Sequence, residues 1–432
     1  MTPAQRSPLR LLVAGALATV VGLPALASPP AAAAAPLTSR MVAAAPARVV
    51  LPAKATKKTT IKTNLPATVT VNRYGVRTST TLKVKASGKK LRYVWQSQAP
   101  GSTAWKKVKK GKSTTLKLTA KWATGTGFRV VVKGKKGNAT SRTAVLTVVG
   151  QTDTPALDAQ TRFGLSGLSQ GVDLSAYQYG VNMRAIANWS GPGGFTMLRN
   201  ASGARPAHTD YTSLCGGGKG NTGAVPVVED CAYAGLADAA TDRGLKLGHY
   251  WFNGWVTSKD PTATQVFANG YTVQNSAADF VGWLLADGNY TTASTDPLVL
   301  DVEDGRAWTT KVGSRKYTAT LKAWTPVEAA AFVAAVKALL PNANLYVYMS
   351  ANAASRKTTT GAYVWAPLAT TTRLWVASWG SDNGQVPDAE PKTGPWGTWS
   401  IWQYTSQLRI AGSWTGPIDG DLAKPDAWAP LG

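Results

Sequence analysis

The 432-residue chain contains no aspartate or glutamate before Asp153. From Arg48 to Arg142 it carries 24 lysine and arginine residues, whereas residues 151–432 carry 20 of these against all 22 acidic residues. The chain is therefore expected to consist of a polycationic part and a nearly neutral part. A sign asymmetry of this size predicts an anionic partner for the basic part.

Histidine and cysteine are scarce. The two histidines, His208 and His249, are too few and too far apart in sequence for a convincing zinc site, and no cofactor is expected. The two cysteines, Cys215 and Cys231, flank a glycine-rich segment. In an exported chain an even cysteine count favours one disulfide that closes this loop, and two free thiols are the alternative.

Apolar runs long enough to cross a membrane are absent beyond the amino terminus. There, Arg6 and Arg10 precede the run LLVAGALATVVGLPALA, which ends in the small-x-small tripeptide Ala25-Leu26-Ala27. This pattern predicts a signal peptide over residues 1–27, with a retained membrane anchor as the alternative. The sequence thus predicts a secreted, extracellular protein.

Residues 28–150 are expected to form a spacer and a β domain. Residues 28–47 are rich in alanine and proline, as flexible spacers are. Residues 48–150 contain seven short alternating runs, from PATVTVNR to TAVLTVV, which predict an antiparallel sandwich with Trp95 inside and the lysines outside. The run YVWQSQAPGSTAWKKV and the strands after it resemble bacterial immunoglobulin-like modules, although the cysteine pair of antibody domains is missing.

A polar linker is expected over residues 151–168, and one further domain over residues 169–432. In that domain short apolar runs alternate with helical segments such as TPVEAAAFVAAVKALLP, where Glu328 follows Thr325 at capping-box spacing and the pattern stops before Pro341. Strand–helix alternation of this length predicts a TIM-like (β/α) barrel. The expected fold class is α/β, with the barrel preceded by a small all-β sandwich.

Acidic residues stand at the ends of predicted strands in this second domain. The strand PLVLDVEDG ends in Asp301 and Glu303, and their i, i+2 spacing places both on one side of the strand. Asp173 belongs to the first strand pattern and Asp419 to the last, and barrels carry working residues at strand ends. Paired carboxyl groups are typical of glycosidases. The alternatives are solvated loop residues, helix N-caps or a divalent-metal site.

Seven motifs between residues 169 and 428 resemble, in their order, the family 25 glycoside hydrolase lysozymes. They are GVDLSAYQ, GLKLGHYWF, PLVLDVED, NLYVYMS, LWVASWG, WSIWQYTS and PIDGDL. The resemblance implies hydrolysis of the β-1,4 bond between N-acetylmuramic acid and N-acetylglucosamine in peptidoglycan. It implies Glu303 as general acid and Asp301 as the partner that supports attack by the substrate's own 2-acetamido group. Asp173 and Asp419 match the other two acids of the cleft.

Further residues match positions that line the sugar cleft of the family, and core packing is the alternative for each of the aromatic ones. These residues are Tyr177, Tyr250, Tyr348, Trp375, Trp402, Gln403 and Asp421. One segment departs from the family pattern, because residues 199–203 stand where Lys-Ala-Thr-Glu-Gly is usual and Ser202 replaces the acid. An active muramidase is the leading hypothesis, since all four carboxylates are present. The alternative is a wall-binding barrel that no longer cleaves.

The expected partners are peptidoglycan glycan strands for the barrel and anionic cell-wall polymers, such as teichoic acids, for the basic domain. A soluble spacer with a solvated lysine surface is the alternative for the latter. No nucleic-acid motif and no stacking platform for single strands is visible, so nucleic acid is not expected as a partner. These partners predict a cell-wall-associated protein.

Overall fold

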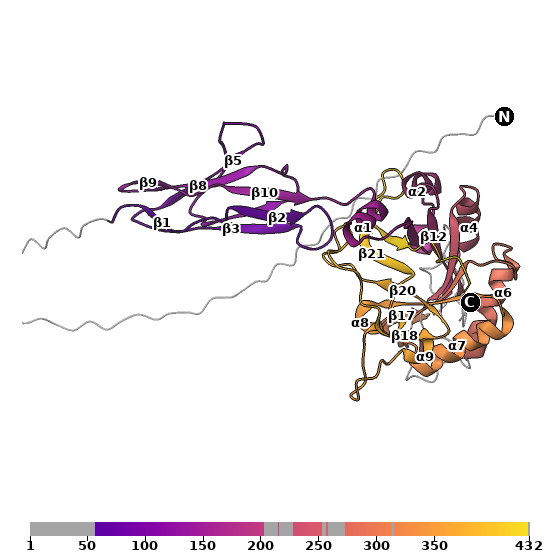
Figure 1. The fold of residues 1–432 in the computed structure, drawn as a ribbon. Helices are drawn as coiled ribbons and strands as arrows, with labels where there is room; N and C mark the ends of the chain where they lie inside the picture. The colour runs from indigo at the N-terminus through magenta and orange to yellow at the C-terminus, as the bar shows by residue number, and fades with distance from the viewer. Residues whose placement is uncertain are drawn as a thin grey trace, which may run out of the picture. The chain divides into compact units, whose positions relative to one another are not determined.

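The computed structural model describes residues 57–202, 215, 228–252, 256–257, 273–312 and 315–430. The predicted signal peptide and spacer, and His208, lie outside these residues. Within them, no helix combines the length and the apolar character that a membrane span requires. The described chain forms a β domain followed by a barrel domain (Figure 1).

The β domain contains all seven predicted strand segments, one of which is divided into β3 and β4, and two additional short strands, β1 and β9. One sheet has the order β2-β10-β8-β5-β6 with β9 paired to β8, and the pairs β3-β7 and β1-β4 stand apart from it. The expectation of a purely antiparallel sandwich is wrong at one place, because β10 pairs with β2 in parallel. The strands are β1 Thr60–Thr63, β2 Thr68–Asn72, β3 Ser79–Lys83, β4 Lys85–Ser87, β5 Arg92–Gln98, β6 Lys106–Gly111, β7 Thr115–Thr119, β8 Gly127–Gly134, β9 Gly137–Thr140 and β10 Ala144–Val149.

The larger sheet and the two strand pairs of the β domain share one apolar core. Buried side chains alternate with exposed or half-buried ones along β5, which places Tyr93 and Trp95 inside. Leu118 from β7 and Val130 from β8 belong to the same cluster. The indole Nε1 of Trp95 donates a hydrogen bond of 3.1 Å to the carbonyl of Ser113, so the polar atom of this buried ring is satisfied. The packing is that of a sandwich, and its immunoglobulin-like character stays a prediction.

Part of the predicted linker is structured. Helix α1 (Pro155–Phe163) lies within residues 151–168, with Pro155 at its first turn and Gly164 in the left-handed conformation at its end. Its Ala156 and Ala159 are buried in the core of the barrel domain. Gln151 is also fixed, because its side chain exchanges two hydrogen bonds with the backbone of Arg409. The expected linker is therefore largely part of the barrel domain.

Eight strands of the second domain close into a barrel, in the order β11-β22-β21-β20-β19-β16-β14-β12 with β12 paired back to β11. Seven of them run parallel, but β22 is antiparallel to both neighbours, which corrects the expectation of a regular TIM-like barrel. Strand β13 (Val228–Glu229) pairs with the end of β12. The barrel strands are β11 Ser169–Leu174, β12 Phe195–Ser202, β14 Lys246–Phe252, β16 Pro297–Asp301, β19 Asn344–Ser350, β20 Arg373–Ala377, β21 Ile401–Leu408 and β22 Ile418–Ala423.

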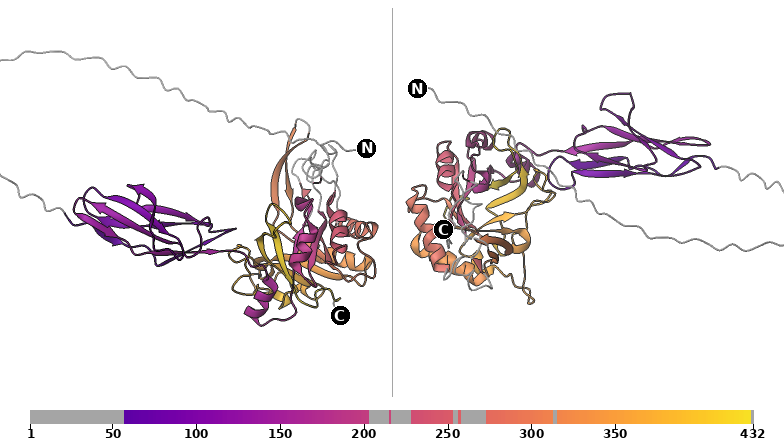
Figure 2. Two further views of the ribbon diagram at one scale, coloured as in Figure 1. Left: turned by 90° about the horizontal axis from the view of Figure 1, so that it is seen from above. Right: turned by 180° about the vertical axis from the view of Figure 1, so that it is seen from behind.

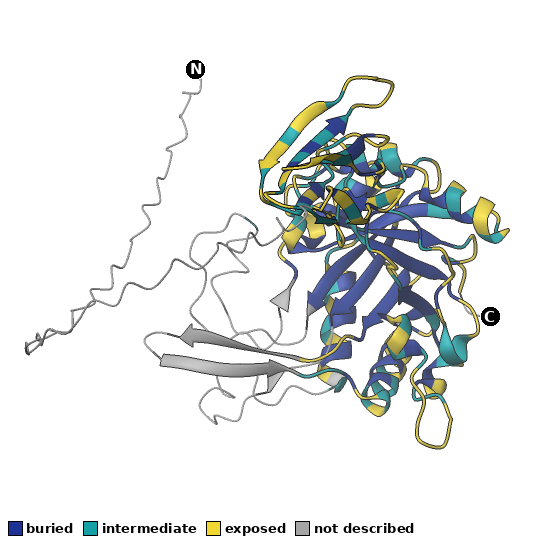
Figure 3. Cartoon of the chain, turned by 90° about the vertical axis from the view of Figure 1, so that its left-hand side faces the viewer, coloured by how far each residue is buried: buried dark blue, intermediate teal, exposed yellow. Residues whose placement is uncertain are grey.

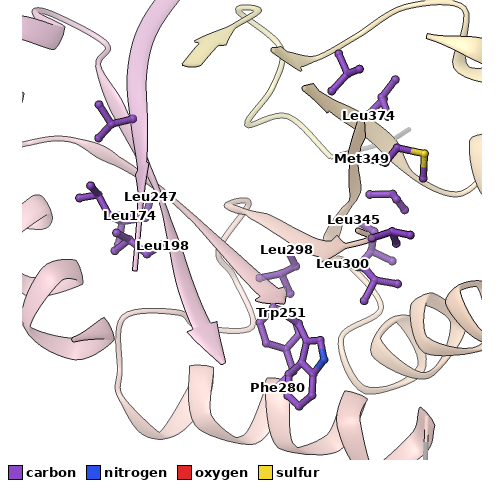
Figure 4. Close-up of a cluster of buried hydrophobic side chains, with 14 of the residues drawn as sticks. Leu174, Leu198, Leu247, Trp251, Phe280, Leu298, Leu300, Leu345, Met349 and Leu374 are labelled. Atoms are coloured by element: carbon purple, nitrogen blue, oxygen red, sulfur yellow. The ribbon is translucent and has the colours of Figure 1, made fainter. Parts of the chain in front are cut away.

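Helices cover the outside of the barrel (Figure 2). Helix α7 has the predicted start and end, with a complete capping box between Thr325 and Glu328. The outward side chains of the strands pack against these helices, as Trp251 of β14 does against Phe280 of α6 (Figure 4). The helices are α2 Met183–Ser190, α4 Tyr233–Thr241, α6 Val273–Ala286, α7 Pro326–Leu339, α8 Ala351–Ala354 and α9 Ala366–Ala369. The remaining elements of this domain are η1 Ala176–Gln178, β15 Val256–Thr257, β17 Arg306–Val312, β18 Arg315–Leu321 and η2 Gly394–Trp396.

The inward side chains of the barrel form a second, smaller core. Phe195, Met197, Tyr346 and Ile401 fill one end, where they are fully buried. Figure 3 shows that the barrel strands are largely buried. Aromatic and acidic side chains occupy the other end, at the carboxyl ends of the parallel strands. Because β22 is antiparallel, its first residues reach this same rim. The fold therefore brings Asp419 to the end of the barrel where the other strand-end acids lie.

Candidate active site

The four predicted acids meet at one rim of the barrel. Asp173 of β11 and Asp419 of β22 are direct partners in the strand pairing. Asp301 is the last residue of β16, and Glu303 follows two residues later. All four line a single pocket, although they come from three segments that are far apart in the sequence. The structure thus shows the spatial gathering that the strand-end pattern predicts.

Aromatic and polar side chains complete the wall of this pocket. Tyr348 of β19 and Trp375 of β20 are partners in the strand pairing, and their ring centroids are 4.5 Å apart. The ring centroid of Tyr250 from β14 is 5.8 Å from that of Trp375. Tyr177 stands at the edge with half of its side chain exposed. The full lining is Asp173, Tyr177, Arg199, Tyr250, Phe252, Asp301, Glu303, Tyr348, Trp375, Trp379, Gln403 and Asp419.

The acids of the pocket differ in their access to water. Glu303 is exposed, Asp419 is half-buried, and Asp173 and Asp301 are buried. Burial, followed by the negative charge of Glu303, raises the pKa of Asp301 well above its ordinary value, while Arg199 opposes this shift. Burial and the charge of Asp173 likewise raise the pKa of Asp419. A pocket of this kind can hold a proton on one carboxyl group beside another that is charged.

One hydrogen-bond network fixes the floor of the pocket. The Oε1 atom of Gln403 accepts bonds of 2.9 Å from the hydroxyl of Tyr348 and from Nε1 of Trp379, while its Nε2 donates to Asp173 at 2.8 Å. Gln403 is therefore held in one orientation by three neighbours. A side chain so constrained keeps its neighbours pre-positioned for a substrate.

Asp421 lies behind the pocket lining and supports it. The residue is fully buried, accepts a 2.8 Å hydrogen bond from Nε1 of Trp375 and shares a side-chain hydrogen bond with Asp173. Burial raises the pKa of Asp421 to about 8, although both hydrogen bonds act to lower it. Burial and the charge of Asp421 in turn raise the pKa of Asp173 well above its ordinary value. The expected substrate contact of Asp421 is thus replaced by a contact with Trp375 and Asp173.

Trp402 does not line the pocket, which corrects its expected position. Its neighbour Gln403 faces the pocket, and adjacent residues of a strand point to opposite sides. Trp402 consequently points outward, where its ring packs against Trp399 and Phe163 and its Nε1 donates to the carbonyl of Ser378 at 2.9 Å. Core packing, the alternative for each aromatic residue, holds for Trp402.

Three pocket residues were not predicted as site residues: Arg199, Phe252 and Trp379. Arg199 is buried and forms an ion pair of 2.7 Å with Asp230, which also accepts hydrogen bonds from the backbone amides of Ala176 and Ala232. A buried charge needs such a partner. The sequence signal for Arg199 was its place at the head of the segment that departs from the family pattern. Ser202 of the same strand pairs with Phe252 along the backbone.

The two cysteines form the predicted disulfide, between Cys215 and Cys231, with Cα atoms 6.1 Å apart. No group of three or more histidine, cysteine or acidic side chains in the described part of the chain is placed to hold a metal ion. His249 is buried and bonded through Nδ1 to the hydroxyl of Tyr233 at 2.8 Å. This histidine is part of the packing between the barrel and α4.

A family model for glycosyl hydrolases family 25 matches residues 226–413, a range that includes Asp301 and Glu303 but not Asp173 or Asp419. A pertactin model matches residues 102–191, which run from the β domain into the barrel domain. A search of curated proteins found no significant match.

Three solved structures are similar to the chain at low identity. The spore cortex lytic enzyme SleM of Clostridium perfringens is 18% identical, with 60% of this chain and 67% of that chain covered and a TM-score of 0.37. A family 39 glycoside hydrolase of Bacteroides cellulosilyticus is 11% identical, with 83% and 80% covered and a TM-score of 0.29. The C-terminal domain of Legionella pneumophila ChiA is 10% identical, with 49% and 60% covered and a TM-score of 0.26.

None of these structural similarities is strong enough to carry a functional conclusion. The family match is different, because it covers the strand that bears Asp301 and Glu303 and the pocket residues Tyr348, Trp375 and Gln403. With the carboxyl groups gathered at one barrel rim, this match makes the chain a glycoside hydrolase of the lysozyme type.

Proposed function

We propose that the protein hydrolyses the β-1,4 bond between N-acetylmuramic acid and N-acetylglucosamine in peptidoglycan, with Glu303 as the general acid. The observation that carries the proposal is the gathering of Asp173, Asp301, Glu303 and Asp419 around one aromatic-walled pocket. The aromatic rings of the pocket wall suit the apolar faces of sugar rings, and the polar groups between them suit hydroxyl and amide groups.

The position of Glu303 at the exposed edge of the pocket suits proton donation to the glycosidic oxygen. As the bond from the anomeric carbon to this oxygen breaks, the carbonyl oxygen of the substrate's 2-acetamido group attacks the anomeric carbon. Asp301, beside Glu303 on the same strand end, supports the acetamido N–H during this attack. Water then opens the cyclic intermediate, and Glu303 takes one proton from that water, which returns the site to its starting state.

The test is the variant Glu303→Gln, assayed by release of reducing ends from purified peptidoglycan. Because a general acid contributes at least about 10²-fold to the rate, we expect a loss of at least this size. Asp242→Asn, which removes an exposed acid at the end of α4, is the control and should keep wild-type activity.

Mass spectrometry of the products identifies the bond, because muramidase cleavage leaves muramic acid at the new reducing end. Wild-type activity in Glu303→Gln would contradict the proposed role of this residue. Retention of the wild-type protein on peptidoglycan without new reducing ends would favour the non-catalytic, wall-binding barrel, which the Ser202 departure suggests.

We further propose that the protein is exported and that its β domain attaches to anionic wall polymers. No carboxylate occurs between residues 57 and 152, so the cations of this domain have no internal counter-ion. Lys107, Gln96 and Arg129 lie in one row across β6, β5 and β8. The guanidinium of Arg129 is 4.0 Å from the ring centroid of Trp105, and its Nε donates to Gln96 at 2.8 Å. Such unpaired cations favour a polyanion as partner.

A further inference from the structure

A second pocket adjoins the catalytic one across Glu303. Glu303, Tyr348 and Trp379 line both pockets, so the second begins beside the proposed proton donor. Its walls come from the segment after β16, the segment before α7, the end of β19 with α8, and the end of β20. The remaining lining residues are Val302, Asp304, Ala323, Trp324, Ser350, Ala353, Arg356, Trp365 and Ala377.

The floor of this second pocket is apolar. Trp324 is 3% exposed, Trp365 is 2% exposed and Ala377 is buried, so the apolar groups that line the pocket are held in place by packing. Small apolar groups, such as the methyl groups of alanine residues, suit a surface of this kind. The pocket is therefore suited to small apolar groups as well as to the hydroxyl groups of a sugar.

Among the residues that the structure describes, Arg356 is the only cation that lines this second pocket. Its backbone is fixed, because its amide donates to Ala353 at 3.1 Å and its carbonyl accepts from Val364 at 2.9 Å. Its guanidinium Cζ is 5.8 Å from the ring centroid of Trp365. Arg356 is exposed, and no carboxylate among the described residues lies within ion-pair distance of it.

The two arginines at the joined pockets thus have different roles. Arg199 in the catalytic pocket is buried and already paired with Asp230. Arg356 is held against an indole face at the edge of the second pocket, with its planar donors available. A guanidinium in this situation binds a carboxylate through two parallel hydrogen bonds.

We propose that the second pocket binds the peptide stem of peptidoglycan, with Arg356 holding a stem carboxylate. This inference rests on the proposed function, because it takes the muramyl sugar to lie beside Glu303. The stem leaves that sugar through its lactyl group, is rich in alanine and carries free carboxylates. Its methyl groups match the apolar floor, and its charge matches Arg356.

The test compares two ligands of equal glycan length: soluble glycan fragments that bear stems, and the same fragments after an amidase has removed the stems. Binding is measured in a Glu303→Gln background, so that the fragments stay intact. Arg356→Ala should weaken binding of stem-bearing fragments about tenfold, the effect of one charge-assisted contact, and leave stem-free fragments within about twofold. Arg356→Lys should retain part of the affinity, because it keeps the charge but loses the planar fork.

Lys357→Ala is the matched control. Lys357 is the next residue, is exposed, and its Nζ is 4.7 Å from the ring centroid of Tyr363, so the substitution removes the same charge without touching the pocket. Binding of stem-free fragments shows in the same experiment that each variant is folded. Equal weakening for both ligands, or no weakening for either, would overturn the proposal.

This binding measurement also separates the inference from the proposed function. If the wild-type protein released no reducing ends, the proposed hydrolysis would be wrong, and the ratio of the two affinities would still decide the role of Arg356. If the wild-type protein cleaved both ligands and Arg356→Ala did not change that ratio, the stem pocket alone would be wrong.

Discussion

At the scale of single residues, the carboxyl groups of the cleft are chemically distinct although they share one rim. Glu303 is exposed and reaches solvent and both pockets, whereas Asp301 and Asp173 are buried and held by their surroundings. Different environments give neighbouring acids different pKa values, so that one can hold a proton while the other is charged. The exposed group can exchange protons with water, and the buried groups can shape and stabilise charge within the pocket.

Asp421 gives a testable pH dependence. Burial raises its pKa to about 8, so the folded state holds this proton more tightly than the unfolded chain does. The resulting stabilisation is complete below about pH 4 and is lost as the pH rises through about 8. Asp421→Asn cannot ionise and can still accept from Trp375. Between about pH 5 and about pH 8 the free energy of unfolding should fall less for Asp421→Asn than for the wild-type protein. The difference between the two losses should be on the order of 1 kcal/mol or more.

Urea unfolding of both proteins at the two pH values measures this difference. Asp242→Asn, which changes an exposed acid, should follow the wild-type pH dependence. The prediction is contradicted if Asp421→Asn and the wild-type protein lose equal stability over this range.

The sequence predicted the acids of the site better than their neighbours. Asp301 and Glu303 could be predicted because a strand end and an i, i+2 spacing define one face without any knowledge of tertiary structure. Trp402 was placed on the wrong face, since the motif around it does not show which of two adjacent residues points inward. Trp379 lies after the end of β20, in a segment whose path depends on the neighbouring strands. No local pattern could have placed it in the pocket.

At the scale of elements, helix α7 is an example of a structure that residues close in sequence are enough to predict. Thr325 and Glu328 form the predicted capping box. The Glu328 amide donates to Oγ1 of Thr325 at 3.3 Å, and the Thr325 amide donates to Oε2 of Glu328 at 2.9 Å. Lys322 adds a 2.9 Å ion pair to Glu328. These contacts are local in sequence, and both ends of this helix could therefore be predicted.

Removal of the Thr325 cap should destabilise the barrel domain. Thr325→Ala leaves the amide of Glu328 without its side-chain acceptor, and we expect a loss of about 1 kcal/mol in the free energy of unfolding. Thr325→Ser keeps the hydroxyl and should lose much less. Denaturant unfolding followed by tryptophan fluorescence measures both values. Equal stabilities of Thr325→Ala and Thr325→Ser would show that the hydroxyl does not act as a cap.

The direction of β22 and the place of α1 could not be predicted in the same way. The PIDGDL pattern fits a strand of either direction, and only closure of the barrel between β21 and β11 decides it. The segment that forms α1 has only nine residues, and its Ala156 and Ala159 gain their burial from the barrel core, whereas its larger Leu157 is exposed. In both cases the deciding contacts are distant in sequence.

At the scale of the whole molecule, the β domain and the barrel domain differ in their charge. All 22 acidic residues lie at or after Asp153, in the barrel domain and the segment that leads into it. The charged side chains of the β domain are all cations. The proposed attachment to anionic polymers should therefore be driven largely by the release of counter-ions and weaken steeply as salt rises.

Binding of the full-length Glu303→Gln protein to purified cell walls tests this attachment over a range of salt concentrations. Lys107→Gln with Lys110→Gln should lower the affinity at low salt by about fivefold per lysine, the contribution of a cation near an anionic surface. Lys337→Gln with Lys392→Gln removes two exposed charges from the barrel domain and is the control, with little effect expected. Retention that does not change with salt would contradict the electrostatic attachment.

The missing carboxylates of the β domain have one more consequence. The domain also lacks histidine, so lysine and arginine supply all of its side-chain charge. The cleft of the barrel behaves differently, because acidification protonates its carboxyl groups. Under the two proposals, acidification should therefore change the hydrolysis more than it changes the charge with which the β domain attaches to the wall.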